Sequence, residues 1–110
     1  PNESSVIVID SGTILMYDVF TGRYFRSSLE RVSQSLSKAN WTIANEGYFS
    51  LNEWYDAMGL EGIPLGEDIG WNSNQLLETR TSACISDEGT PALSVDFNYK
   101  PFPGYFKTHS

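Results

Sequence analysis

The sequence predicts one α+β domain in which an antiparallel sheet, built from an N-terminal and a C-terminal hairpin, is covered by one long and one short helix. Strand-like regions near both ends and two helical patterns between them indicate this order of elements. A length of 110 residues fits a single hydrophobic core, so we expect residues 1–110 to form one domain.

The N-terminal part of the chain contains three strand-like segments. Residues 6–9 are a β-branched run that ends at the turn-forming residues 10–12, which predicts a short strand. Residues 14–18 and 23–26 then flank a tight connection in which Gly22 can adopt a positive φ angle. These two segments are predicted to form the first hairpin.

A long helix is predicted from about Ser28 to Glu46. Its apolar residues recur at intervals of three and four, as expected for one buried stripe: Leu29, Val32, Leu36, Ala39 and Ile43. Ser27 and Glu30 have the spacing of a capping box at its start, and Gly47 can supply the left-handed residue at its end.

A second, shorter helix is predicted from Leu51 to Met58. Ser50 can cap it while Glu53 reaches back to the Ser50 amide, and Gly59 can end it. Its apolar face comprises Leu51, Trp54, Tyr55 and Met58. A helix this short is not stable alone, so this face is expected to pack in the core.

The C-terminal hairpin is predicted from alternation on both sides of a turn at residues 87–91. In the two strands the apolar or β-branched positions are Leu77, Thr79, Thr81, Ala83, Ile85, Leu93, Val95, Phe97 and Tyr99. This alternation is typical of a sheet that is covered on one face. Residues 101–104 are expected to end the last strand, with the tail lying along the surface.

The residue types that most enzymes require are scarce. His109 and Cys84 are the only histidine and cysteine, which excludes a Ser/His/Asp triad, a multi-histidine metal site and an internal disulfide. Cys84, on the polar face of its strand, is expected to be partly exposed and passive. Glu53 and Asp56 could form a carboxylate pair, but the capping-box spacing favours a structural role for Glu53. We therefore predict no enzyme activity, no metal site and no cofactor.

The acidic composition narrows the range of partners. Seven basic and 14 acidic residues give a formal net charge of -7, which disfavours nucleic acid and anionic lipid surfaces as partners. No apolar run approaches the length that spans a membrane, so we expect no membrane contact by this segment itself. Acidic residues in the glycine-rich loop lack the alternating spacing of an EF-hand, so a solvated loop is favoured over a calcium site.

Several motifs resemble a known family. They are Tyr17-Asp18, Thr21-Gly22-Arg23-Tyr24-Phe25 with Ser27, Ser50-Leu51-Asn52-Glu53-Trp54-Tyr55, Gly59-Leu60, Gly66 with Gly70-Trp71-Asn72, and the hairpin around Gly89, Pro91 and Asp96. Over nearly its whole length, the chain resembles the C-terminal domain of an uncharacterised family of phages and prophages of Gram-positive bacteria. Trp41 and Thr42 depart from the more polar pattern usual there.

The resemblance implies viral origin and a location in the virion or the host cytoplasm, without implying an activity. In that family the domain commonly follows a hydrophobic, membrane-associated region. We therefore expect this chain to be the soluble C-terminal module of a longer phage protein, or a stand-alone version of it.

We predict a non-enzymatic module that acts by protein–protein contact, either within the virion or against a host component. One alternative is an inhibitor of a bacterial defence system, and a more remote one is a cell-wall glycan hydrolase using Glu53 and Asp56. The hairpin tip, short helix and glycine-rich loop supply the candidate contact residues Arg23, Tyr24, Asn52, Tyr55, Asp56 and Trp71. For Trp71, burial against the sheet is the alternative.

Overall fold

The computed structural model describes residues 13–74 and 76–106 and confirms the α+β class. A four-stranded sheet contains β1 (Ile14–Asp18), β2 (Arg23–Ser27), β5 (Thr79–Ile85) and β6 (Pro91–Phe97). A three-stranded sheet contains β3 (Tyr48–Ser50), β4 (Ile69–Asn72) and β7 (Phe102–Pro103). The helices are α2 (Leu29–Glu46), α3 (Leu51–Met58) and the 3₁₀ helix η1 (Pro64–Glu67).

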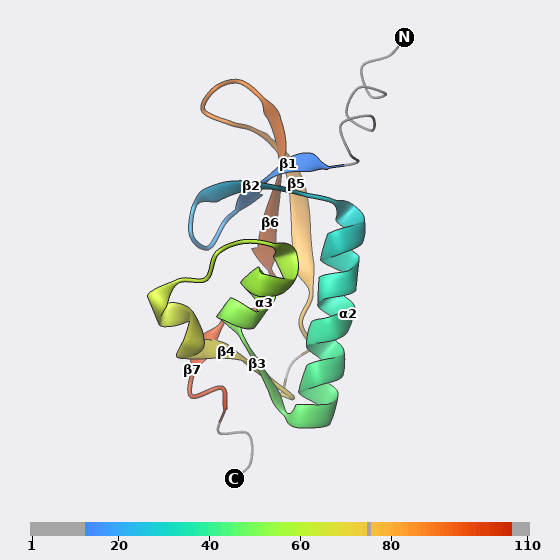
Figure 1. Ribbon diagram of the computed structural model, residues 1–110, viewed down its shortest axis with the longest axis vertical. Helices are drawn as coiled ribbons and strands as arrows, with labels where there is room; N and C mark the ends of the chain where they lie inside the picture. Colours follow the sequence, from blue (N-terminus) through green and yellow to red (C-terminus); the bar gives the residue numbers. More distant parts are fainter. Residues whose placement is uncertain (1–12, 75, 107–110) are drawn as a thin grey trace.

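The two predicted hairpins form the larger sheet, with strand order β2-β1-β6-β5. Both hairpins are antiparallel, but they join through a parallel pairing of β1 with β6, in which Met16 lies beside Leu93. A parallel pair needs a long crossover. Here α2, the small sheet and α3 supply it, and Figure 1 shows α2 running beside both sheets with α3 between them.

The first hairpin is confirmed. Gly22 has a φ of 73°, and its amide donates to the Asp18 carbonyl at 2.7 Å, which closes the turn between β1 and β2. The positive φ explains why glycine is favoured there. The strand predicted at residues 6–9 lies outside the described residues.

The long helix is confirmed, but its start and its buried stripe differ from the prediction. Ser28 caps α2 by accepting from the Arg31 amide at 3.1 Å, so the predicted capping box of Ser27 with Glu30 is wrong. Ser27 still belongs to β2. Leu29, predicted in the core, is 57% exposed because it begins the helix at its outer end. The buried stripe comprises Val32, Ser35, Ala39, Thr42 and Ile43, with Leu36 partly buried.

The short helix α3 matches its prediction. The Ser50 hydroxyl accepts from the Glu53 amide at 3.0 Å, and Glu53 Oε1 accepts from the Ser50 amide at 2.8 Å. Gly59 adopts a φ of 82° and ends the helix. The four predicted apolar residues, Leu51, Trp54, Tyr55 and Met58, are all buried.

Aromatic side chains join the two sheets in one core. Phe97 of β6 lies edge-on to Trp54 and Trp71, with ring centroids 5.8 and 4.9 Å apart. Trp71 is completely buried, and its indole N–H donates to the Tyr99 carbonyl at 2.8 Å. Edge-to-face packing and a satisfied indole favour this arrangement. The core therefore places α3 between the two sheets.

The C-terminal segment does not lie along the surface as predicted. Phe102 and Pro103 form β7, which pairs with Gly70 and Ile69 of β4. Tyr105 is buried, and its hydroxyl donates to the Glu67 carbonyl at 2.8 Å. The prediction was wrong because a strand of only two residues, Phe102 and Pro103, has no periodicity to recognise.

The second hairpin is confirmed, but the helices do not cover all of it. Val95 and Phe97 of β6 are buried, whereas Thr81, Ala83 and Ile85 on the same face of β5 are exposed. Figure 1 shows the β5–β6 turn projecting beyond the helices. The expectation of a covered apolar face therefore holds for β6 and is wrong for β5.

Candidate binding groove

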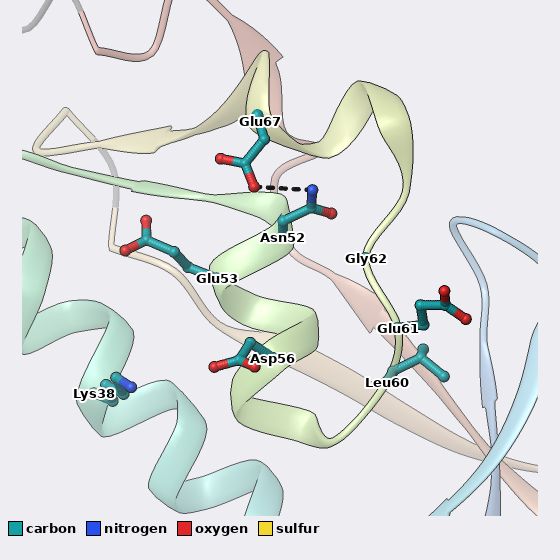
Figure 2. Close-up of a pocket in the computed structure, with 8 residues that line it drawn as sticks. All are labelled: Lys38, Asn52, Glu53, Asp56, Leu60, Glu61, Gly62 and Glu67. Atoms are coloured by element: carbon teal, nitrogen blue, oxygen red, sulfur yellow. Dashed lines mark hydrogen bonds between the residues drawn. The ribbon is translucent and has the colours of Figure 1, made fainter.

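A groove with a volume of about 500 Å³ lies where α3 meets α2 and the loop that follows α3. We name it the acidic groove. Its lining consists of Lys38, Asn52, Glu53, Asp56, Leu60, Glu61, Gly62 and Glu67. Figure 2 shows the Glu53 and Asp56 carboxylates extending from α3 on the side of Lys38, while Asn52 faces the loop.

Asn52 holds the loop wall of the acidic groove in place. Its Nδ2 donates to the Ile63 carbonyl at 2.9 Å and to Glu67 Oε2 at 3.0 Å, while its Oδ1 accepts from the Ile63 amide at 2.8 Å. One side chain thus uses both its donor and its acceptor groups on the loop. The wall of the groove is consequently fixed to α3 before any ligand arrives.

Two glycines let the loop approach Asn52 closely. A Cβ atom at Gly66 would lie 1.9 Å from Asn52 Oδ1, and one at Gly62 would lie 2.7 Å from the same atom. Neither glycine has a positive φ, so the missing Cβ matters here for space and not for backbone conformation. The glycine-rich loop is therefore a packing feature, as its sequence, which lacks a phosphate-binding motif, suggests.

Acidic residues outnumber basic residues in the lining of the acidic groove. Its lining contains four acidic residues, Glu53, Asp56, Glu61 and Glu67, and one basic residue, Lys38, and only the Glu53 and Asp56 carboxylates lie on the Lys38 side of α3 (Figure 2). All four acidic residues and Lys38 are exposed to solvent. This excess of acidic side chains produces a local negative potential that attracts cationic groups.

A buried polar cluster lies behind this groove and joins the first hairpin to α3. The buried carboxylate of Asp18 accepts from the Tyr55 hydroxyl at 2.7 Å, from the Thr21 amide at 3.0 Å and from the Thr21 hydroxyl. Burial, followed by the hydrogen bond to Asp18, raises the pKa of the Tyr55 hydroxyl far above its usual value. Tyr55 therefore stays neutral and serves as a donor to Asp18.

Arg23 links this cluster to the start of the loop. Its Nη1 donates to the Glu61 carbonyl at 2.7 Å, its Nε donates to Thr21 Oγ1 at 2.9 Å, and its guanidinium carbon lies 5.0 Å from the centroid of the Tyr55 ring. Two nitrogens of the side chain thus bond within the domain, while its buried Nη2 has no hydrogen-bond partner among the described residues. Arg23 is thus mainly a brace between β2 and the loop.

The structure separates the six predicted contact residues. Asp56 is exposed and lines the acidic groove, which Asn52 also lines while it holds the loop. Tyr24 is 39% exposed on β2, and Arg23 is partly buried. Tyr55 and Trp71 are 1% and 0% exposed, so these two assignments to a contact surface are wrong. Both aromatic side chains instead pack in the core, the alternative that the sequence left open for Trp71.

Sequence reasoning missed the other charged residues of the groove. Lys38 lies on α2, whereas Glu61 and Glu67 lie in or near the loop, and only the tertiary fold brings them beside α3. The acidic residues of the glycine-rich loop were the one sequence feature that indicated a negative electrostatic potential there. Within residues 13–74 and 76–106 no set of three potential metal ligands converges, and no helix is long and apolar enough to cross a membrane.

Residues 1–106 match DUF6353, a family of unknown function. The chain belongs to this family. No curated protein and no solved structure matches the chain. Membership of DUF6353 confirms the expectation of an uncharacterised family.

Proposed function

We propose that this DUF6353 domain is a non-enzymatic binding module whose acidic groove receives a basic segment of a protein partner. The observation that carries the proposal is the charge of the groove, whose lining contains four acidic residues and a single lysine. Complementary charge attracts such a segment and favours the correct partner over others. Leu60 adds an apolar contact to the same lining.

The rigidity of the groove supports a binding role. Asn52 fixes the loop, the capping box fixes the start of α3, and Arg23 braces the loop from the opposite side. A groove that is already ordered loses little conformational entropy when a ligand binds. The same fixed geometry is what a recognition surface requires.

The structural role of Glu53 supports a binding module over the remote alternative of a glycan hydrolase. Glu53 Oε1 accepts from the Ser50 amide, and the side chain stays exposed on α3. Glycosidases usually place their two carboxyl groups on opposite sides of the scissile bond. Glu53 and Asp56 instead extend from the same side of α3 (Figure 2).

The resemblance to phage and prophage proteins suggests that the partner belongs to the virion or to the host. The acidic groove also fits the alternative of a defence inhibitor, because a negative surface can mask a basic site on a nucleic-acid-binding enzyme. Both versions share one chemistry, which is the recognition of clustered lysine or arginine side chains.

A binding measurement with matched charge variants tests the proposal. We expect a fluorescent nona-arginine peptide to bind the unchanged domain and to bind the double variant Asp56→Asn/Glu61→Gln at least tenfold more weakly. The control variant Asp87→Asn/Glu88→Gln removes the same two charges at the β5–β6 turn, where both residues are exposed, and should bind as the unchanged domain does. Equal losses in both variants would show attraction to net charge alone and would contradict a specific groove.

Partner capture from infected cells then separates the two versions of the proposal. Proteins that are retained by the unchanged domain and by Asp87→Asn/Glu88→Gln, but lost with Asp56→Asn/Glu61→Gln, are groove partners. Virion proteins in this set favour a structural role, and host nucleic-acid-binding enzymes favour inhibition. Raising the salt concentration should weaken capture, because exposed charges are screened.

A further inference from the structure

Strand β5 forms an edge of the larger sheet that lacks the usual protection against pairing. Among the described strands it pairs only with β6, over seven consecutive residues from Thr79 opposite Phe97 to Ile85 opposite Pro91, without a bulge. It contains no proline and no lysine, and its one charged residue is Arg80. Edge strands in monomeric proteins are commonly short, bulged, charged or covered. The opposite edge, β2, has only five residues and carries two arginines.

Within residues 13–74 and 76–106, no other element covers β5. None of its seven residues is buried, and Ile85 is 65% exposed. The exposed residues lie on both faces of the strand, because Thr81 and Ala83 face one side while Arg80 and Ser82 face the other. A second strand could therefore lie beside β5 without displacing a side chain from the core.

The hydrogen bonds at the ends of β5 reveal which backbone groups point outward. The Asn98 amide donates to the Glu78 carbonyl at 2.9 Å, and the Ser86 amide donates to the Thr90 carbonyl at 2.8 Å. These pairs continue the β5–β6 register, so even-numbered residues bond to β6. The backbone groups of the odd-numbered residues consequently face the free edge: Thr79, Thr81, Ala83 and Ile85.

We propose that β5 pairs with β5 of a second copy of this chain, antiparallel about a two-fold axis at Ser82, to form a continuous eight-stranded sheet. In this register Thr79 lies opposite Ile85 of the second copy, and Thr81 lies opposite Ala83. Each of these pairs joins two residues whose N–H and C=O groups point outward, so all the free backbone groups of the edge find partners. A two-fold axis closes the assembly at a dimer.

The charges of the strand favour a second copy as its occupant. In a chain with a net charge of -7, β5 has no acidic residue, so the strand itself adds no repulsion between carboxylates of the two copies. The proposed register places Arg80 opposite Cys84 of the second copy and keeps the two Arg80 side chains apart. Within its own copy Arg80 Nη2 lies 4.0 Å from Asp96 Oδ2, on the side away from the new partner.

The size of the contact sets its expected strength. Two seven-residue strands bury less than the roughly 1,600 Å² of a standard protein interface. We therefore expect a reversible dimer whose population rises with protein concentration. Raising the salt concentration should also favour it, because salt screens the repulsion between two acidic copies. This dependence is opposite in sign to that of binding in the acidic groove, so the two proposals can fail separately.

A disulfide across the proposed axis tests the register. Ser82 and its symmetry mate form a pair without backbone hydrogen bonds, for which the Cα atoms lie about 4.5 Å apart, within the range that a disulfide spans. The variant Cys84→Ser/Ser82→Cys, equilibrated in a thiol–disulfide buffer, should become a covalent dimer. The control Cys84→Ser/Ser94→Cys places the thiol on β6, about 14 Å from its mate at the usual strand spacing, and should stay monomeric in denaturing electrophoresis. Equal crosslinking in both variants would overturn the register.

The oligomeric state tests the edge itself. We expect light scattering to find more dimer as the concentration of the unchanged chain rises, and only monomer for Thr81→Pro, which removes an outward amide and no bond to β6. Ala83→Lys places a charge at the same edge without altering the backbone and should have the same effect, while Asp56→Asn/Glu61→Gln should leave the dimer intact. A monomer at every concentration, or a dimer that survives both β5 variants in folded protein, would refute the proposal.

Discussion

Strands β4 and β5 differ sharply in burial and in their place within a sheet. All four residues of β4 are buried, and the strand lies between β3 and β7 in the centre of the small sheet. None of the seven residues of β5 is buried, and the strand lies at an edge. The buried hydrophobic core is therefore concentrated around β4 and α3, whereas the free edge of β5 is exposed to solvent.

The largest effect should come from removing the central side chain of β4. Trp71→Ala should lower the free energy of unfolding by about 3 to 5 kcal/mol, because it leaves a cavity beside Phe97 and an unpaired carbonyl at Tyr99. Ile85→Ala in β5 should change it by less than about 0.5 kcal/mol at a concentration where the chain is monomeric. Urea unfolding measures both variants, and similar costs would abolish the distinction between the strands.

The same chemical change at two glycines makes the comparison sharper. A Cβ at Gly70 in β4 would lie 2.3 Å from the Phe49 carbonyl oxygen and 2.8 Å from Ser50 Cα, both backbone atoms of β3. Gly70→Ala should therefore cost about 3 kcal/mol. Gly89, in the β5–β6 turn, has open space around it and a φ of 84°, so Gly89→Ala should cost only about 1 kcal/mol through backbone strain. Thermal unfolding that ranks them in reverse would disprove this account.

The hydrogen bond between Tyr55 of α3 and Asp18 of β1 joins the core around α3 to the larger sheet, to which β5 belongs. Tyr55→Phe should cost about 1 to 3 kcal/mol, because the buried Asp18 carboxylate loses a donor. The raised pKa of Tyr55 adds a dependence on pH. Its contribution is fully present below about pH 10, the value for an unfolded tyrosine, and falls above it as the unfolded chain loses the proton first.

Unfolding measured from pH 8 to pH 11 separates the two effects. The unchanged domain should lose stability above pH 10 more steeply than Tyr55→Phe, so that the two curves converge. Parallel curves would mean that Tyr55 does not titrate differently in the folded and unfolded chains.

A smaller effect than that of Tyr55→Phe is expected from the cap of α3. Ser50→Ala should cost about 1 kcal/mol, since it removes the acceptor for the Glu53 amide, whereas Glu53→Gln can still complete the capping box. Circular dichroism during thermal unfolding measures both. A well-folded Glu53→Gln variant that still bound the basic peptide but had lost a biological activity of the domain would instead revive the catalytic alternative.

The contrast between β4 and β5 also explains what the sequence could predict. The alternation of β5 and the capping box of Ser50 and Glu53 are local signals, and both elements formed as predicted. Strand β4 has no such local signal. It forms because it pairs with β3, and Gly70 fits closely against the backbone of β3 and the side chain of Tyr105, which are distant in sequence. Alternation indicates a strand but not its burial, which is why the exposure of Thr81 and Ala83 was missed.

The site was predicted less completely than the fold, because most of its contacts join residues that are distant in sequence. Asp56 follows from its place on the polar face of α3, and it lines the groove. Tyr55 was assigned to a contact surface for its aromatic ring, yet its neighbour Asp18 comes from a strand 37 residues away. Aromatic residues are enriched both in cores and in interfaces, so residue type alone did not separate the two.

The clamp formed by Asn52 has a consequence for how the family can vary. The side chain of Asn52 occupies the space that a Cβ would need at both Gly62 and Gly66. We therefore expect the residues at these three positions to change together among relatives. Relatives that keep asparagine at this point of α3 should keep both glycines, and relatives that lose it are free to carry larger residues in the loop. We expect the loop to differ in shape among such relatives. The acidic groove, of which the loop is one wall, should then differ in shape as well.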